Sequence, residues 1–194
     1  MRADAPPAAF HREVAAGFGA VVDAVPPGGW DAPSPVEGWA ARDVVGHLTT
    51  WLPGLLASSG GPRLPEGPSA DEDPAAAWHH QARAVQDLLD DEANASVVLS
   101  NPNFGEVPLP AAISQFYTGD VFMHTWDLAR ATGQDVDLDA ELAGQMLDGM
   151  APMEDLLRSS GQYGPAVPVA DDAPVADRLI GFIGRDPSWR APAS

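Results

Sequence analysis

The sequence predicts an all-α protein built as a helical bundle, and three observations support this fold class. Apolar residues recur at intervals of three and four positions over several long segments. Segments rich in Pro, Gly and Ser separate them, and 45% of the 194 residues are hydrophobic, as in folded globular chains. Four or five helices joined by such connectors are typical of bundles. The length fits one domain, 1–194, with a bundle core at about 5–158 and an extended tail at 159–194.

The first two predicted helices cover about Pro6–Val25 and Ala40–Ala57. A Pro-Pro-Gly-Gly sequence at 26–29 ends the first, and we expect Pro53 to kink or shorten the end of the second. Both helices carry an apolar stripe at helical spacing. Its members are Phe10, Val14, Phe18, Val21 and Val22 in the first and Val44, Leu48, Trp51 and Leu55 in the second.

The middle of the chain contains a connector, a third helix and a short β-like segment. Residues 58–74 are rich in Gly, Pro and Ser and are expected to form a long connector. The third helix is predicted at about Pro74–Glu92, with Pro74 in its first turn. In residues 96–110, a β-like stretch followed by an Asn-Pro-Asn turn sequence predicts a short hairpin or an extended loop.

The fourth helix has the clearest pattern, at about Leu109–Thr132, and Gly133 stops it. Asp139 is suited to cap a fifth helix that runs to about Arg158. The tail contains several prolines and one short helical stretch near Pro174–Ile183. The sequence thus predicts a bundle with an additional C-terminal helix and tail.

Composition excludes several classes of function. The chain has no cysteine, so it can form neither disulfides nor thiolate metal sites. All ten basic residues are Arg, and a lysine Schiff base is therefore impossible. A formal net charge of −18 repels nucleic-acid phosphates and anionic lipid headgroups, so we expect neither nucleic acid nor a membrane surface as a partner.

The N-terminal residues and the hydropathy pattern bear on location. The first ten residues, MRADAPPAAF, lack the apolar core of a signal peptide. No run of apolar residues approaches the roughly 18 needed to span a membrane. We therefore expect a cytoplasmic protein.

Polar residues occupy core positions on two of the predicted helices. The stripe of the fourth helix should contain Ile113, Phe116, Tyr117, Asp120, His124 and Leu128. Asp120 and His124 are one turn apart on this face, and His47 lies on the apolar side of the second helix. A buried carboxylate must be paired or bound to a metal. Two His and one carboxylate form a common set for a catalytic divalent ion with open positions.

A purely structural interpretation accounts for the same spacing. In it, Asp120 and His124 hydrogen-bond each other, and His47 is a core histidine with satisfied hydrogen bonds. A shift of the stripe by one residue is a further alternative. Spacing alone favours the structural interpretation.

Two sequence blocks resemble a known family. Trp30, Pro33-Ser34-Pro35 and residues 38–48, GWAARDVVGHL, resemble the second-helix signature of the DinB-like superfamily. They are most similar to the mycothiol-dependent maleylpyruvate isomerase N-terminal-domain group and its single-domain actinobacterial metal-binding relatives. Residues 120–133, DVFMHTWDLARATG, resemble the fourth-helix motif of that group, and Phe182-Ile183-Gly184-Arg185-Asp186-Pro187 with Trp189 resembles the end of the single-domain relatives.

The resemblance implies a DinB-like four-helix bundle with a metal site on its inner face. The metal-ligand positions of the family fall on His47, Asp120 and His124. The isomerases carry Glu where this chain has Asp120, so the ion must lie closer to the helix or bind less tightly. The isomerases also have a second domain that helps to form the active site, for which 194 residues leave no room. Maleylpyruvate isomerisation itself is therefore not the expected reaction.

The implied function is that of a divalent-metal-binding enzyme. Zinc is the expected ion, and nickel or iron accepts the same ligands. A small-molecule thiol, mycothiol in the family, would be the cosubstrate, and an electrophilic small molecule the substrate of a transferase or isomerase. The alternatives are a non-catalytic metal-binding or stress-related protein and a metal-dependent hydrolase.

Other polar and aromatic residues have less distinctive expected roles. Asp127 could orient a metal-bound histidine or pair with Arg130 on the surface, and we favour the surface pairing. Asp43, one turn before His47, has the same two interpretations, and Tyr117 is expected to pack rather than to donate a proton. Three tryptophans on or beside the second and fourth helices are expected in the core or the wall of the site: Trp39, Trp51 and Trp126. The remaining histidines have no supporting pattern or are expected in solvent: His11, His79 and His80.

Overall fold

The structure is a computed structural model that describes residues 5–159 and 161–192. Residues 1–4, in the segment expected to lack a signal sequence, lie outside the described residues. Residues 160 and 193–194 of the predicted tail lie outside them as well. Among the described residues, none of the helices combines the length and apolar character that a membrane span requires.

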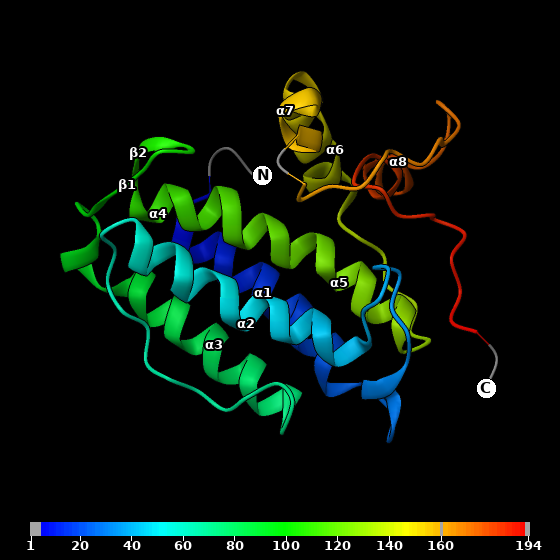
Figure 1. Ribbon diagram of the computed structural model, residues 1–194, viewed down its shortest axis with the longest axis horizontal. Helices are drawn as coiled ribbons and strands as arrows, with labels where there is room; N and C mark the ends of the chain where they lie inside the picture. Colours follow the sequence, from blue (N-terminus) through cyan, green and yellow to red (C-terminus); the bar gives the residue numbers. More distant parts are fainter. Residues whose placement is uncertain (1–4, 160, 193–194) are drawn as a thin grey trace.

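Four long helical segments lie side by side and form the bundle (Figure 1). They are α1 (Pro7–Asp23), α2 (Ala41–Ser58), α3 (Pro74–Asp90) and a fourth segment that starts with α4 (Leu109–Ala112) and ends with α5 (Gly119–Ala131). Helix α1 packs against α3 and α5, and α2 packs against the same two helices. This arrangement makes α2 face α5, and these two helices carry the polar residues of interest.

The bundle helices bury most of the stripes that the sequence predicts, but Trp51 and Leu55 at the end of the α2 stripe are only half-buried. Phe10, Phe18 and Val22 of α1 are buried, as are Val44 and Leu48 of α2. Helix α3 begins at Asp73, whose side chain accepts a hydrogen bond from the backbone N–H of Ala76 at 2.9 Å. Pro53 lies inside α2, which continues to Ser58, so the expected shortening at Pro53 does not occur.

The fourth segment is helical throughout but is not a uniform α-helix. Residues Ile113–Thr118 form a π-helical stretch between α4 and α5. A π-helix has more residues per turn than an α-helix, so a residue placed on the buried face by α-helical spacing can point away from that face. Phe116, predicted in the core, is therefore only half-buried and packs against Phe104 with ring centroids 5.2 Å apart. The helix ends at Gly133, whose φ of 70° is the left-handed conformation that favours glycine.

The expected hairpin and the cap of the fifth helix are present. Strands β1 (Val98–Asn101) and β2 (Gly105–Pro108) pair antiparallel, with Leu99 opposite Val107. The Asp139 side chain accepts from the N–H of Leu142 at 2.8 Å and caps α6 (Ala140–Met150). The predicted single helix to Arg158 is instead broken by a 3₁₀ turn, Ala151–Met153, and continues as α7 (Glu154–Ser159). Pro152 explains the break, because it lacks an N–H and clashes with the preceding turn.

The C-terminal helix and short turns complete the chain. Helix α8 (Val175–Phe182) corresponds to the predicted helical stretch and packs against α6. Helices α6 to α8 lie to one side of the bundle, next to α5 (Figure 1). Two further 3₁₀ turns lie at Gly29–Asp31 and Glu92–Asn94. A bridge between Pro33 and Ala40 shapes the loop that presents Trp39 at the start of α2.

Candidate metal centre

His47, Asp120 and His124 form one cluster between α2 and α5. His47 Nε2 lies 2.9 Å from Asp120 Oδ2, and His124 Nε2 lies 3.4 Å from Asp120 Oδ1. One ligand atom from each side chain lies within 4.8 Å of the other two. Two facing helices thus bring together the three residues that the sequence singled out.

The cluster is open on one side. The side chains of His47 and Asp120 are 31% and 20% exposed, whereas His124 is only 6% exposed. His124 therefore anchors the cluster in the core, and the other two reach the surface. A cation held here would keep positions accessible to solvent or to a small molecule.

Asp120 is held as a carboxylate by contacts with His47, His124 and the Trp51 N–H. Trp51 Nε1 donates to Asp120 Oδ2 at 3.0 Å, beside the contact with His47. Burial alone would raise the pKa of Asp120, but His124, His47 and the Trp51 N–H outweigh it, and the net pKa lies below the usual value. Trp51 is therefore part of the wall and also fixes one ligand.

Asp127 orients His124, and the favoured surface pairing with Arg130 is wrong. The Asp127 side chain is fully buried, and its Oδ2 lies 2.8 Å from His124 Nδ1. Arg130 instead lies near Asp135. Because Nδ1 is occupied by this contact, Nε2 of His124 is the nitrogen that faces Asp120 and the open side.

Arg185, from the end of α8, completes the contacts around Asp127. Its Nε donates to Asp127 Oδ1 at 3.3 Å and its Nη2 donates to Oδ2 at 3.2 Å. Burial would raise the pKa of Asp127, but His124 and Arg185 lower it below the usual value. Sequence analysis missed Arg185, because a contact over 58 positions leaves no spacing pattern. The one available signal was its place in the Phe-Ile-Gly-Arg-Asp-Pro block.

The two carboxylates beside His124 also set its charge. Burial lowers the pKa of His124, while Asp120 and Asp127 raise it, and the net pKa lies above the usual value. A cation that binds to Nε2 must therefore displace a proton that the apo cluster holds well. Metal affinity at this centre is expected to fall on acidification.

Aromatic side chains line the cluster. The Trp39 ring lies 5.2 Å from the His47 ring and 5.9 Å from the His124 ring, centroid to centroid. Trp51 lies 5.7 Å from Tyr117, which is fully buried as expected for a packing role. Tyr163 is a further neighbour that the sequence did not reveal: burial, followed by the charge of Asp120, raises its pKa to about 12.

The other candidate residues lie outside the cluster. Asp43 accepts from the backbone N–H of Ala40 at 2.8 Å and caps α2, so it orients no ligand. His79 is partly exposed and pairs with Asp23 at 2.7 Å, and His80 contacts the carbonyl of Pro65. His11, which had no supporting pattern, is buried on α1 and bonds Gln86.

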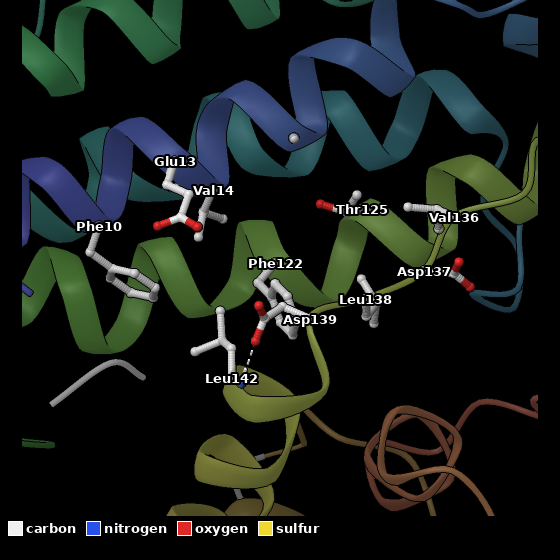
Figure 2. A pocket seen from close by; sticks show the side chains of 11 residues that line it. Phe10, Glu13, Val14, Phe122, Thr125, Val136, Asp137, Leu138, Asp139 and Leu142 are labelled. Atoms are coloured by element: carbon white, nitrogen blue, oxygen red, sulfur yellow. Dashed lines mark hydrogen bonds between the residues drawn. The ribbon is translucent and has the colours of Figure 1, made fainter.

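A separate cavity of about 190 Å³ lies between α1, α5 and the segment that leads into α6 (Figure 2). Its lining is mainly apolar, with Phe10, Phe122 and Leu142 pointing into it. The lining residues do not include the three candidate ligands. This cavity therefore bears on packing between α1 and α5 rather than on the metal centre.

The donor chemistry of the cluster fits a divalent cation. Two neutral imidazole nitrogens and one carboxylate oxygen are suitable ligands for zinc, nickel or iron. His124 already has the carboxylate partner on its second nitrogen that metal-bound histidines usually have. The purely structural interpretation accounts for the contacts of Asp120 with His47 and His124, and metal binding is what distinguishes the two interpretations.

Comparisons with known proteins place the chain among its relatives. Residues 11–129 match the mycothiol maleylpyruvate isomerase N-terminal domain, a stretch that contains all three candidate ligands. Two uncharacterized proteins of Mycobacterium tuberculosis, from strains CDC 1551 / Oshkosh and ATCC 25618 / H37Rv, are each 32% identical over 188 residues. These alignments cover 92% of this chain and 97% of each relative. No solved structure matches. The chain therefore belongs to the family of the mycothiol maleylpyruvate isomerase N-terminal domain, with its DinB-like helical fold.

Proposed function

We propose that His47, Asp120 and His124 bind one divalent cation, and that the protein is a metal-dependent thiol transferase or isomerase acting on a small electrophile. One observation carries the proposal. Three ligand atoms from two packed helices lie within 4.8 Å of one another at a face that stays open. Zinc suits this ligand set best, and nickel and iron are the other candidates.

The three proposed ligands and the residues that hold them have distinct roles in this function. His124 is fixed by Asp127, Asp120 is fixed by the Trp51 N–H, and His47 completes the set from α2. A bound cation would supply a Lewis acid that lowers the pKa of a thiol and holds it as the thiolate. Trp39 would limit access of water on one side of the cluster.

The thiol must come from outside the chain, which has no cysteine. The name of the family supports mycothiol as the cosubstrate. Substrates of this class carry an activated double bond or a leaving group that a thiolate can attack. The −18 net charge disfavours highly anionic substrates unless a local positive group offsets it.

The first test is metal content combined with ligand replacement. Protein purified without chelator should carry close to one zinc per chain, and His47→Ala and His124→Ala should each abolish tight binding. His79→Ala and His80→Ala are matched controls on α3 and should retain the metal. Equal losses in all four variants would indicate general destabilisation, and a wild-type protein that takes up no metal would refute the site.

The second test separates thiol chemistry from its alternatives. Cobalt-substituted protein should change its ligand-field spectrum when a small thiol is added. A change with hydrolysable esters but not with thiols would instead support a hydrolase. A spectrum insensitive to both would support a non-catalytic metal-binding protein.

A further inference from the structure

We infer that Arg185 is a positioning residue of the metal centre, and that it couples docking of the C-terminal segment, residues 161–192, to metal binding. The inference rests on the proposed metal site. It extends the centre beyond the family-matched residues 11–129 to a part of the chain that the match does not cover.

Arg185 makes a bidentate contact with the Asp127 carboxylate. Its Nε and Nη2 donate to different oxygens of the Asp127 carboxylate, and the remaining Nη1 donates to the carbonyl of Ile183 at 2.9 Å. Paired contacts of this kind fix the plane of the carboxylate as well as its position. The side chain is only 14% exposed, so water competes weakly for these bonds.

The backbone at the end of α8 sets the direction of Arg185. The N–H of Arg185 donates to Ile180 O, and the N–H of Gly184 donates to Gly181 O, both at 3.0 Å. This hydrogen-bond pattern ends the helix with Gly184 at a φ of 87°. A Cβ at Gly184 would also lie 3.1 Å from the carbonyl oxygen of Pro165. The turn is thus fixed both by conformation and by close packing against residues 164–165.

The contact reaches the candidate ligand through one shared oxygen. Asp127 Oδ2 accepts from Arg185 and lies 2.8 Å from His124 Nδ1. Without the guanidinium, the fully buried Asp127 carboxylate would retain its contact with His124 but lose the two bonds that fix its plane. The His124 ring, which Asp127 orients, would then be held less firmly with Nε2 toward Asp120 and His47. Partners of this kind typically change metal affinity by roughly 10–100-fold when removed.

Thermodynamic linkage makes the effect reciprocal. If docking of Arg185 strengthens metal binding by some factor, metal binding strengthens docking by the same factor. The C-terminal segment should therefore be held more firmly to the bundle when the centre is loaded.

Arg158 provides a matched control for general effects of docking. It donates to the carbonyls of Gly164 and Phe182, so it also holds the C-terminal segment. Its guanidinium also pairs with the Glu154 carboxylate, whereas Asp127 contacts Arg185. Loss of Arg158 removes hydrogen bonds within this part of the chain but leaves α8 packed against α6, so the segment should stay docked and the contacts of Asp127 should stay in place.

The experiment compares wild type with Arg185→Met, Arg185→Lys and Arg158→Met. Zinc affinity is measured by competition with a chromogenic chelator, the ligand field by cobalt substitution, and docking by amide exchange in α8 with and without zinc. We expect Arg185→Met to weaken zinc binding by about tenfold, the lower end of the range for such partners, and to alter the cobalt spectrum. Arg185→Lys keeps the charge but cannot make the paired contact, so it should recover only part of the zinc affinity and of the cobalt spectrum. Arg158→Met should have the zinc affinity and the cobalt spectrum of wild type. Zinc should slow amide exchange in α8 of wild type, but it should not do so in Arg185→Met.

A second variant covers the case in which Arg185→Met does not fold. The double variant Asp127→Asn/Arg185→Met removes both buried charges and keeps an oxygen that can accept from His124. It should bind zinc as weakly as expected for Arg185→Met, and zinc should likewise fail to slow amide exchange in α8. Unchanged zinc affinity in folded Arg185→Met (or in the double variant, if Arg185→Met does not fold) would overturn the inference. Equal weakening in Arg158→Met would overturn it as well. A wild-type protein that binds no metal would instead refute the proposed function.

Discussion

At the scale of residues, the short side chain of Asp120 contacts both candidate histidine ligands. Its two oxygens reach the Nε2 atoms of His47 and His124, and the Trp51 N–H reaches the same carboxylate. The three side chains therefore form a compact cluster. A bound ion must replace direct contacts between the ligands by bonds to the metal.

Substitution of Asp120 tests whether the carboxylate is a ligand or a structural partner. Asp120→Asn keeps the shape but removes the charge that offsets the cation, so zinc affinity should fall by at least about tenfold while the fold is retained. Asp120→Glu should be tolerated, because it keeps the carboxylate and the family resemblance places Glu at this position. Competition with a chromogenic chelator measures affinity, and melting of the apo-protein measures stability. A lower melting temperature with unchanged affinity in Asp120→Asn would make Asp120 a structural partner.

His11 gives the folded state a specific pH dependence. Burial lowers the pKa of His11 below the ordinary value of 6.5, despite its contact with Gln86. The unfolded chain therefore takes up this proton first, and acidification from about pH 7 through 6.5 and below should reduce the free energy of unfolding. His11→Gln removes the titration, and its stability should fall less over the same range. Urea unfolding at several pH values checks this, and parallel curves for the two proteins would contradict it.

The candidate ligands could be predicted from sequence, whereas the contacts that hold them could only partly be predicted. Asp127 follows His124 by three positions and Asp120 by seven, so helical spacing already places it on the inner face. The surface interpretation failed because a cation three positions further along the helix, Arg130, offered a local partner. The true partner, Arg185, comes from a distant helix end that local patterns do not encode.

At the scale of elements, the departures from the predicted helices follow from local geometry. The stripe rule assumes a constant 3.6 residues per turn, and the π-helical stretch before α5 breaks that assumption at Phe116. Pro152 divides the predicted fifth helix, whereas Pro53 is accommodated inside α2. Proline identity alone does not distinguish these outcomes, because the effect of each depends on how the surrounding helix packs.

Two glycines within helices should respond oppositely to the same substitution. A Cβ at Gly17 of α1 would meet no atom within 4 Å, and the residue borders the cavity of Figure 2. Gly17→Ala should therefore stabilise the fold by about 0.5–1 kcal/mol through helix propensity. A Cβ at Gly181 of α8 would overlap Val169 and lie 2.7 Å from the carbonyl oxygen of Val167, so Gly181→Ala should cost about 1–3 kcal/mol. Thermal melting of both variants measures the effects, and shifts of the same sign would contradict the prediction.

At the scale of the whole molecule, the candidate centre joins helices far apart in the sequence. His47 and Asp120 are separated by 73 positions, and Arg185 brings the C-terminal segment to the same point. The helical class, the order of the long helices and the hairpin could be predicted, because each rests on local patterns. Which helix faces which, and where α8 docks, depend on long-range packing that periodicity does not specify.

A bound ion should therefore stabilise the whole fold. Free zinc at about 100 times the dissociation constant contributes about 2.7 kcal/mol to the free energy of unfolding. For a chain of this size, that corresponds to a rise in Tm of roughly 5–10 °C. Because the −18 net charge attracts cations to the surface generally, His124→Ala is the necessary control. An equal rise in Tm for wild type and His124→Ala would assign the stabilisation to surface carboxylates.

The tryptophans beside the cluster give the protein an intrinsic optical probe. Trp39 lies against the rings of both histidines, and the Trp51 indole N–H is bonded to Asp120. Indole emission responds to the charge of nearby groups and is quenched by neighbouring paramagnetic ions such as cobalt and nickel. Fluorescence of the unlabelled protein should therefore follow occupancy during a titration, and Trp39→Phe and Trp51→Phe would separate the contribution of each ring. Inhibitors or substrates could then be screened by emission alone, before any turnover assay exists.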